Sequence, residues 1–335
     1  MFTKYINNPV TFTTPYFAAI IGSQPSKGAR SPTLWNNAFK KLNMPATYLA
    51  FDTSEDNIKN LVATLRKDKK FIGGSVTNPY KEKLFELVDE VHPSAQCGAV
   101  NCLYRPSPNK IGGMNTDGLG AYFSLKQQKD YEKLIKHKNL LSALLWGSGG
   151  VAKAIACALL SERGSPFNKL TIVFRNKSKL AFWSHLRENI QYKDKLNFIS
   201  QEEIFHDKEK HDVIFHCTPV GSQIVGLEKW SACGALPQEL TKPSSLSLKK
   251  NMTTSLETLK RLSFSSSILF DVNYTPSTSV IMSQWQSIRA STPLNGLNMN
   301  LLQAVVAFSQ VMNKIRWLNT KEVSQEEILK LMSSH

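Results

Sequence analysis

The sequence predicts an α/β protein of two domains. With 335 residues, the chain is longer than one compact core of ordinary size, so two domains are the natural expectation. Short apolar runs of strand length alternate with amphipathic segments along most of the chain, and this alternation is typical of helices packed on parallel-rich sheets. Hydrophobic residues make up 41% and charged residues 20%, which is the composition of a chain that folds around buried cores.

Three strands are predicted in the first third of the chain, each a short apolar run, at residues 17–21, 46–51 and 71–76. Amphipathic segments follow them and predict helices at residues 32–41, 54–67 and about 81–91. Because a helix separates each strand from the next, we expect a parallel-rich sheet.

A second α/β unit begins near Leu140. Its first apolar run ends in a cluster of glycines, and a helix of small residues follows directly. Further strands are predicted at residues 170–174, 212–216 and 268–271. This succession is the pattern of a dinucleotide-binding fold.

The amino-acid composition changes at two places in the last part of the chain. Residues 228–267 are rich in Ser, Thr and Lys, so we expect a partly mobile surface excursion with one helix around residues 256–262. After Pro293, apolar residues at helical spacing predict a helix over residues 301–318. A terminal helix can then return to pack on the first domain.

The composition argues against several classes of partner. The formal net charge is +15, but the basic residues are spread in short groups without interleaved aromatic residues, which favours a solvated surface over a nucleic-acid site. No apolar stretch is long enough to span a bilayer, and the first residues lack the pattern of a secretion signal. The five cysteines are odd in number and show no metal-ligand spacing. We expect a cytoplasmic protein with free thiols, without a metal, and without nucleic-acid or membrane partners.

A glycine cluster at residues 147–150 follows the first strand of the second unit. Glycines there allow a tight turn and a close approach of the backbone to a pyrophosphate, while the N-terminus of the next helix offers free N–H groups. The position between a strand and an Ala-rich helix is the one that a dinucleotide site requires. We therefore expect a cofactor at this loop.

The end of the next strand is where the adenosine ribose of a dinucleotide lies. NAD sites tend to place a carboxylate there, whereas a 2′-phosphate calls for positive charge. This chain has Arg175, Lys177 and Lys179 instead of a carboxylate, which favours NADP.

One lysine and one aspartate form a candidate proton-transfer pair. Lys81 begins a predicted helix just after a strand, where the positive helix end disfavours an ammonium group unless a carboxylate offsets it. Asp117, in the glycine-containing segment NTDGLG, supplies such a carboxylate. Taken alone, either residue is more often a surface charge or a cap, but together they can move a proton.

Eight segments resemble, in order, the signatures of the shikimate and quinate dehydrogenase family. They are a strand followed by Ser31-Pro32, then VTNPYK at 76–81, GAVN at 98–101, NTDGLG at 115–120, GSGGVAKA at 147–154, TPVG at 218–221, DVNYTPST at 271–278 and NGLNMNLLQA at 295–304. The similarity extends from about Tyr16 to Asn313.

The resemblance implies two domains and their site residues. A discontinuous α/β substrate-binding and catalytic domain spans residues 1–124 and 295–335, and a Rossmann-type NADP-binding domain spans residues 125–294 with an insertion at about 228–267. Lys81 matches the catalytic lysine and Asp117 its partner. The positions that match substrate-binding residues are Ser31, Thr77, Asn101, Tyr274 and Gln303. The positions that match the cofactor site are Gly147, Ser148, Gly149, Gly150, Val151, Arg175, Asn176, Lys179, Thr218, Pro219, Val220, Gly221 and Met299.

The chain departs from the family pattern at three positions. Ala29 replaces a serine that holds the substrate carboxylate, Asn298 replaces a glycine near the nicotinamide, and Phe174 replaces an Asn before the ribose-phosphate Arg. Arg30 is the nearest residue that could compensate for the missing hydroxyl, although it could equally be an ordinary loop charge.

The resemblance implies NADP-dependent, reversible reduction of 3-dehydroshikimate to shikimate, a step of aromatic amino acid biosynthesis. A quinate or aminoshikimate dehydrogenase is an alternative, and a non-catalytic ligand-binding regulatory protein is another. The presence of both Lys81 and Asp117 favours the enzyme, because a sensor needs no proton donor. We expect a monomer or a homodimer.

Overall fold

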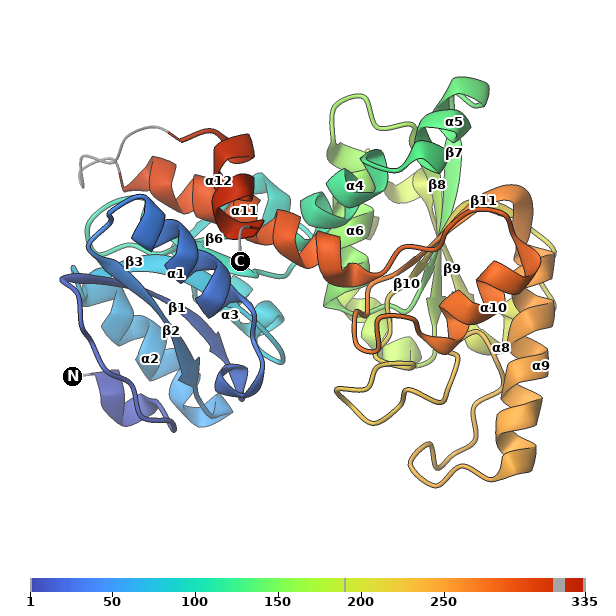
Figure 1. Cartoon of the computed structure of the whole chain (residues 1–335), viewed down its shortest axis with the longest axis horizontal. Coiled ribbons are helices and arrows are strands. Elements are labelled where there is room, and N and C mark those ends of the chain that lie inside the picture. Colours follow the sequence, from blue (N-terminus) through green and yellow to red (C-terminus); the bar gives the residue numbers. More distant parts are fainter. Residues whose placement is uncertain (1, 190, 316–322, 334–335) are drawn as a thin grey trace. The chain divides into compact units, whose positions relative to one another are not determined.

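The structure, a computed structural model, describes residues 2–189, 191–315 and 323–333, and the side chains of Lys179, Phe182 and His185 lie outside this description. The chain divides into two compact units (Figure 1), which are Met1–Gly120 with Asn300–His335, and Ala121–Met299. Each unit is an α/β layer structure with its own core, as the sequence predicted. Among the described residues, no helix is both long and apolar enough to cross a membrane.

The first unit is built on one mixed sheet with the strand order β2-β1-β3-β5-β6-β4. The strands are β1 Tyr16–Gly22, β2 Ala46–Asp52, β3 Phe71–Val76, β4 Glu90–Val91, β5 Cys102–Tyr104 and β6 Gly112–Met114. The three predicted strands, β1, β2 and β3, run parallel, whereas β5 is antiparallel to both β3 and β6. The helices are α1 Ser31–Lys41, α2 Glu55–Lys67, α3 Lys81–Leu87, α11 Gly296–Lys314 and α12 Gln325–Ser333, of which α11 begins in the second unit.

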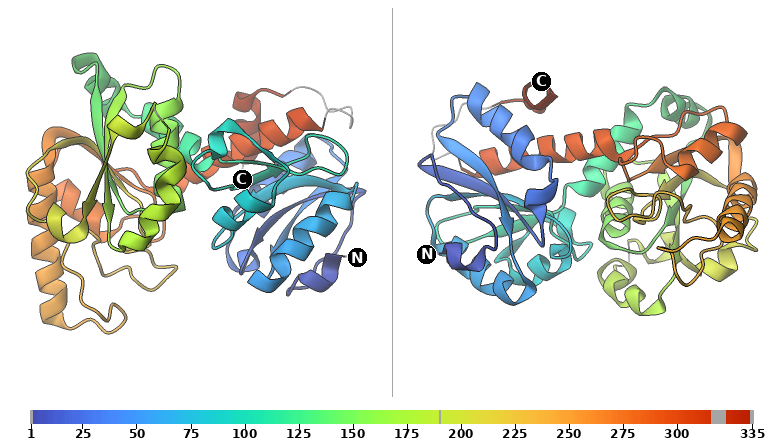
Figure 2. Two further views of the ribbon diagram at one scale, coloured as in Figure 1. Left: turned by 180° about the vertical axis from the view of Figure 1, so that it is seen from behind. Right: turned by 60° about the horizontal axis from the view of Figure 1, so that its bottom comes forward.

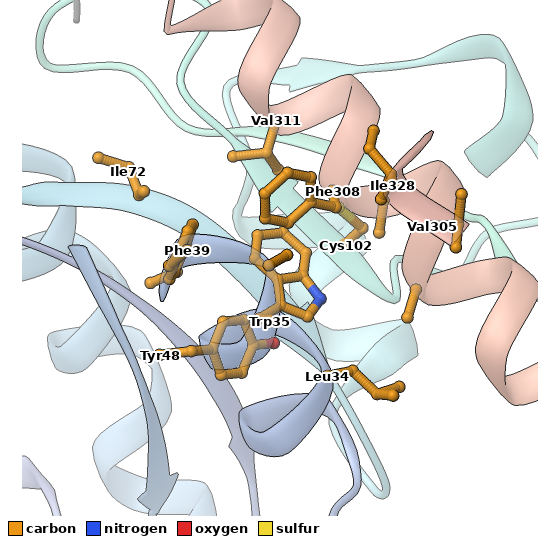
Figure 3. Close-up of a cluster of buried hydrophobic side chains, with 14 of the residues drawn as sticks. Leu34, Trp35, Phe39, Tyr48, Ile72, Cys102, Val305, Phe308, Val311 and Ile328 are labelled. Carbon is orange, nitrogen blue, oxygen red and sulfur yellow. The ribbon is translucent and has the colours of Figure 1, made fainter. Parts of the chain in front are cut away.

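Alternating side chains of β1 enter two separate cores. Ala18 and Ile20 lie in the core formed with α1, α11 and α12, and Ala19 and Ile21 lie in the core formed with α2 and α3. This alternation follows from the two-residue period of a strand that is covered on both faces. Figure 3 shows the first of these cores, in which Trp35 lies between Tyr48 and Phe308 with ring centroids 4.8 and 5.0 Å away.

The second unit is built on a five-stranded parallel sheet with the order β11-β10-β7-β8-β9. Its strands are β7 Leu141–Trp146, β8 Phe167–Phe174, β9 Leu196–Ser200, β10 His211–His216 and β11 Ser263–Asp271. The chain starts at the central strand β7, adds two strands on one side and then two on the other. The order therefore reverses between β7 and β10, where parallel sheets of this type leave a crevice outside the carboxyl ends of the strands.

Helices lie on both faces of this sheet (Figure 2). They are α4 Asp117–Lys126, which begins in the first unit, and α5 Lys129–His137, α6 Gly150–Ser161, α7 Ser184–Arg187, α8 Gln201–Ile204, α9 Ser245–Leu262 and α10 Val280–Ile288. The 3-10 helix η4 covers Lys177–Trp183. Every residue of α6 from Ala152 to Leu160 is buried, so this helix is enclosed on all sides, and small side chains allow its close packing; the alanines are Ala152, Ala154, Ala156 and Ala158.

The prediction of a partly mobile surface excursion at residues 228–267 is wrong in the length of its helix and in the burial of several of its residues. The helix α9 covers 18 residues, Ser245–Leu262, whereas the sequence predicted residues 256–262. Asn251, buried on α9, accepts a hydrogen bond from the Ser231 amide and donates to the carbonyls of Ser231 and Ala235. Trp230 is buried in the same core. Polar side chains that bond to backbone hold this segment, so its low apolar content did not reveal the structure.

Two other predicted helix limits also differ from the structure. The helix expected over residues 81–91 ends at Leu87, because Asp89 bonds to Ile111 through its backbone N–H and its carboxylate, and β4 then pairs with β6. The helix expected from residue 301 begins at Gly296, and the part of that prediction at residues 316–318 lies outside the described residues.

Candidate active site

An ion pair joins Lys81 to Asp117 in the first unit. Lys81 is the first residue of α3, directly after the turn that follows β3, and Asp117 is the first residue of α4. The Lys81 Nζ and the Asp117 Oδ2 are 2.5 Å apart, and the two side chains are 16% and 10% exposed. The two residues that the sequence proposed as a proton-transfer pair are therefore in direct contact and remain within reach of a small molecule.

The second carboxylate oxygen of Asp117 is held by an amide. Asn101 donates from Nδ2 to Asp117 Oδ1 at 2.7 Å and to Thr116 Oγ1 at 3.0 Å, and its Oδ1 accepts from the Thr116 backbone at 2.7 Å. Gln303, on α11, accepts from Asn101 at 3.3 Å and from the Thr116 hydroxyl at 3.2 Å. Thr116, which the sequence analysis did not single out, thus links two of the predicted site residues, Asn101 and Gln303.

A group of buried hydroxyls lies in the same unit. Tyr48 donates to Ser75 Oγ at 2.7 Å, and Ser31, the first residue of α1, is buried as well. Burial raises the pKa of Tyr48 far above its usual value, so this phenol stays neutral. Ser31 thus keeps the hydroxyl that the family pattern places near the substrate.

The residue two positions before Ser31 contributes only a methyl group. Ala29 packs against the core that contains Trp35. Its neighbour Arg30 donates to Asn300 Oδ1 at 3.2 Å, and the Asn300 carbonyl accepts from Gln303 Nε2 at 3.0 Å. The Arg30 guanidinium is therefore held beside the turn of α11 that carries Gln303.

Two further residues that the sequence predicted to bind the substrate are Thr77 and Tyr274. Thr77 follows β3, and its methyl group lies so close to Gly22 that a Cβ on this glycine would be 2.4 Å from it. Tyr274 follows β11 and belongs to the second unit, whereas Lys81 and Asp117 belong to the first. The roles of Thr77 and Tyr274 stay predictions.

The glycine loop follows β7 at the point where the strand order reverses. Gly147 has a φ of +123°, and a Cβ built on it would lie 2.9 Å from the Thr218 methyl group, so the loop after β7 touches the loop after β10. A Cβ built on Gly149 or Gly150 would meet no atom within 4 Å. No side chain of the described residues caps α6, whose N-cap is Gly149. Open space above a helix N-terminus with uncapped N–H groups fits a pyrophosphate.

A tryptophan fixes the backbone of this loop from outside. Trp183, the last residue of η4, is fully buried and donates from Nε1 to the Ser148 carbonyl at 3.0 Å. The ring of Trp183 packs edge-on against Phe198 of β9. The sequence analysis missed this residue, since no local pattern connects it to a loop 35 residues earlier.

The residues expected to hold a 2′-phosphate follow β8. Arg175 and Asn176 are exposed, and Asn176 Oδ1 accepts from the Ser178 backbone at 3.0 Å, which caps η4. The side chain of Lys179 lies outside the described residues. The Arg175 side chain is thus presented to solvent at the carboxyl edge of the sheet, as a site for an anion requires.

The remaining predicted cofactor residues lie in the second unit. Val151 is in the first turn of α6, and the loop of Thr218, Pro219, Val220 and Gly221 follows β10. Met299 is buried on α11. Its neighbour Asn298, one of the departures from the family pattern, donates to Ser124 Oγ at 3.2 Å and Gln127 Oε1 at 2.9 Å on and after α4. No disulfide joins the five cysteines, all of which lie among the described residues; they are Cys97, Cys102, Cys157, Cys217 and Cys233.

Comparison with known proteins identifies relatives of this chain. The family model for the shikimate dehydrogenase substrate binding domain matches residues 20–103. A protein of Methanococcus maripaludis named shikimate dehydrogenase (NADP(+)) is 30% identical over 286 residues, which are 85% of this chain and 87% of that protein. A protein of Clostridium botulinum with the same name is 31% identical over 283 residues, which are 83% of this chain and 90% of that protein.

A solved structure shows the same fold. Shikimate 5-dehydrogenase from Listeria monocytogenes, in complex with shikimate and NAD, matches with a TM-score of 0.67 and 23% identity, covering 98% of this chain and 99% of that chain. The similarity thus extends over both units. With relatives about 30% identical along most of its length, this chain belongs to the shikimate dehydrogenase family.

Proposed function

We propose that this chain is an NADP-dependent shikimate dehydrogenase, which interconverts 3-dehydroshikimate and shikimate. The observation that carries the proposal is the contact between Lys81 and Asp117 inside a cluster of amide and hydroxyl groups. Relatives named shikimate dehydrogenase (NADP(+)) support it. An oxidation of an alcohol to a ketone requires a group that accepts the hydroxyl proton, and the pair supplies one.

Lys81 transfers the proton, and Asp117 holds the Lys81 amine in position for this transfer. The Asp117 carboxylate orients the Lys81 amine and stabilises its protonated form after the proton has been taken up. Asn101 occupies the other carboxylate oxygen, which prevents Asp117 from turning away from the lysine. The Gln303 amide, bonded to Asn101 and Thr116, adds a polar group that can bind a substrate hydroxyl.

The second unit is proposed to bind NADP. Gly147, Ser148, Gly149, Gly150 and Val151 would hold the pyrophosphate, and Arg175, Asn176 and Lys179 the 2′-phosphate. The loop of residues 218–221 and Met299 would lie beside the nicotinamide. When bound, NADP accepts or delivers the hydride. The open space above Gly149 and the exposed Arg175 support this assignment.

The domain roles and cellular setting are part of the same proposal. Residues 1–124 and 295–335 would bind the substrate, with Ser31 and Thr77 among the ligands, and residues 125–294 would bind the cofactor and contribute Tyr274 as a further substrate ligand. We propose that the protein acts in the cytoplasm as a monomer or a homodimer; five cysteines without a disulfide suit a reducing compartment. Light scattering of the purified protein and cell fractionation test these two points.

A quinate dehydrogenase is the second candidate. Ala29 packs its methyl group on the core where a carboxylate-binding hydroxyl is expected, so the end of the substrate that carries the carboxylate meets a different surface here. Shikimate and quinate share this carboxylate, and their rings differ. The choice between them therefore depends on measurement.

The test is a panel of initial-rate assays on the purified protein. Shikimate, quinate and aminoshikimate are each supplied with NADP+ and with NAD+, and formation of the reduced cofactor is followed. The highest kcat/KM is expected for shikimate with NADP+. A preference for quinate would replace the substrate assignment. Tight binding of shikimate with no turnover under any condition would favour the regulatory alternative.

A further inference from the structure

Two ionisable side chains are completely buried at the carboxyl ends of neighbouring strands in the second unit. His216 ends β10 and Asp271 ends β11, the two residues are paired in the parallel register, and both are 0% exposed. His216 Nδ1 and Asp271 Oδ1 are 2.9 Å apart. The two residues lie directly behind the loop of residues 218–221.

Asp271 is held in its ionised form. Ser279 donates to Oδ2 at 2.5 Å, and Asn273 donates to Oδ1 from its backbone N–H and from Nδ2, each at 3.0 Å. Burial by itself raises the pKa of Asp271, but the neighbouring His216 and these hydrogen bonds outweigh burial and hold the pKa below its usual value. A carboxylate can only accept hydrogen bonds, so His216 must donate from Nδ1.

The other ring nitrogen of His216 reaches the loop that follows β10. His216 Nε2 and the Thr218 hydroxyl oxygen are hydrogen-bonded at 2.9 Å. The same hydroxyl oxygen accepts the Val220 backbone N–H at 3.3 Å. Asn273 Nδ2, which also contacts Asp271, donates to the Thr218 carbonyl at 2.9 Å. One chain of hydrogen bonds thus runs from Asp271 through His216 and Thr218 into the loop backbone.

Burial of the histidine and the carboxylate costs free energy, because both groups lose their contacts with water. Apolar residues of similar volume would pack there at least as well, so the pair is expected to have a role beyond packing. The buried pair fixes the position of Thr218. The Thr218 methyl group lies against the turn of the glycine loop at Gly147. The position of Thr218 therefore determines the distance between the two loops that flank the switch point.

We propose that His216 is a positioning residue for the cofactor, acting through Thr218 and supported by Asp271. The ring of His216 holds the Thr218 hydroxyl, and thereby the loop of residues 218–221, in the conformation that receives the nicotinamide end of NADP. The inference rests on the proposed function, which assigns this loop to the cofactor. A merely structural role of the pair would alter stability but not couple His216 to Thr218 in binding.

The test is a double-mutant cycle on the dissociation constant for NADP+, measured by calorimetric titration. His216→Asn keeps an amide that can donate to Asp271 but is too short to reach Thr218, and Thr218→Val removes only the hydroxyl. Each single variant is expected to weaken NADP+ binding about three- to ten-fold, the range for one lost hydrogen bond. In the Thr218→Val background, His216→Asn should have no further effect.

His211→Asn is the matched control. His211 is a fully buried histidine on the same strand, at its opposite end, and its ring nitrogens have no hydrogen-bond partner among the described residues. The same substitution there should change Tm but leave the Kd for NADP+ unchanged. An unchanged Kd in His216→Asn, or effects of the two variants that simply add, would overturn the inference.

Failure of the proposed function is distinguishable from failure of the inference. If the native protein does not bind NADP+, the cofactor assignment is wrong, and hydrogen exchange of the Val220 amide then decides on the positioning role. Faster exchange in His216→Asn than in His211→Asn would keep His216 as the residue that orders the loop. Equal exchange in the two variants would remove that role as well.

Discussion

Asp117 uses its two carboxylate oxygens for different partners, Oδ2 for Lys81 and Oδ1 for Asn101. Because the amide already occupies one oxygen, the carboxylate has a single orientation in which the other faces the lysine. The lysine in turn lies at the start of a helix, where the backbone dipole offers no support for an ammonium group. The ion pair is therefore the main local stabilisation of a charged Lys81.

Lys81→Ala is expected to lower kcat by a factor on the order of 10² to 10⁴, the range for a positioned acid or base, while the Kd for NADP+ stays unchanged. Lys83→Ala is the control, because Lys83 lies on the same helix but is exposed and pairs with Glu86. Steady-state kinetics and calorimetric titration measure the two effects. A Lys81→Ala enzyme with near-native kcat would remove this residue from the mechanism.

Arg175→Ala should weaken binding of NADPH far more than binding of NADH. A guanidinium that pairs with a 2′-phosphate has no partner when that phosphate is absent. The ratio of KM for the two reduced cofactors measures this, with Lys193→Ala, an exposed lysine of the same unit, as the control. Equal losses for both cofactors would contradict the assignment of Arg175.

Arg30→Ala is expected to raise the KM for shikimate about ten-fold or more, whereas Ala29→Ser should change it little. The reason is that Arg30 is held by Asn300 beside Gln303, where a guanidinium can replace the missing hydroxyl at a carboxylate with a bond of roughly 1.5–3 kcal/mol. Lys27→Ala, an exposed cation of the same loop, is the control. The reverse pattern, with tighter binding in Ala29→Ser and no effect of Arg30→Ala, would show that Arg30 is an ordinary loop charge.

Thermal stability should fall as the pH decreases below about 6.5, in part because of His211. Burial lowers the pKa of His211 from 6.5, and Lys169 adds to this effect, while Glu209, Asp207 and Asp212 oppose it. The unfolded chain then binds a proton at a pH where the folded protein does not, so stability is full above 6.5 and is lost as the pH decreases from there.

The measurement is the dependence of Tm on pH between about 7 and 5, compared for the native protein and His211→Asn. Asparagine does not titrate, so the slope should be smaller in the variant. The pKa of His92 is also lowered, mainly by burial, and contributes the same trend in both proteins. Identical slopes would mean that His211 is accessible to protons in the folded state.

Much of the fold could be predicted from the sequence, because its long strands are apolar and its helices amphipathic. The strands β5 and β6 could not, since each has three residues and exists only through pairing with distant segments. The strand β9 was missed because its sequence LNFIS carries polar residues at an edge of the sheet. The helix α9 was underestimated because the buried positions in its first part are the polar residues Asn251 and Ser255, and the buried leucines follow only at Leu259 and Leu262.

The site was predicted less completely than the fold. The sequence pattern alone predicted the glycine loop and suggested the lysine with its carboxylate partner, because the loop and the lysine each follow the end of a strand. Asn101 and Gln303 are 202 positions apart, and only the resemblance to a family indicated that they meet. Trp183 and the His216–Asp271 pair gave no signal, because a side chain that bonds to a distant backbone or to a buried partner has no local pattern.

The alanines of α6 have a consequence for how this protein can change. Every residue of α6 from Ala152 to Leu160 is buried, and four of them are alanines, so the distance of the helix and of the glycine loop before it from the surrounding elements depends on side-chain volume. Enlarging the buried Ala154 to leucine would overfill a close-packed site and displace the helix together with the glycines at its start. Affinity for the nucleotide can thus drift through mutations far from it, and sequences that keep the glycines but lose the alanines would have a loop of the right composition at the wrong place.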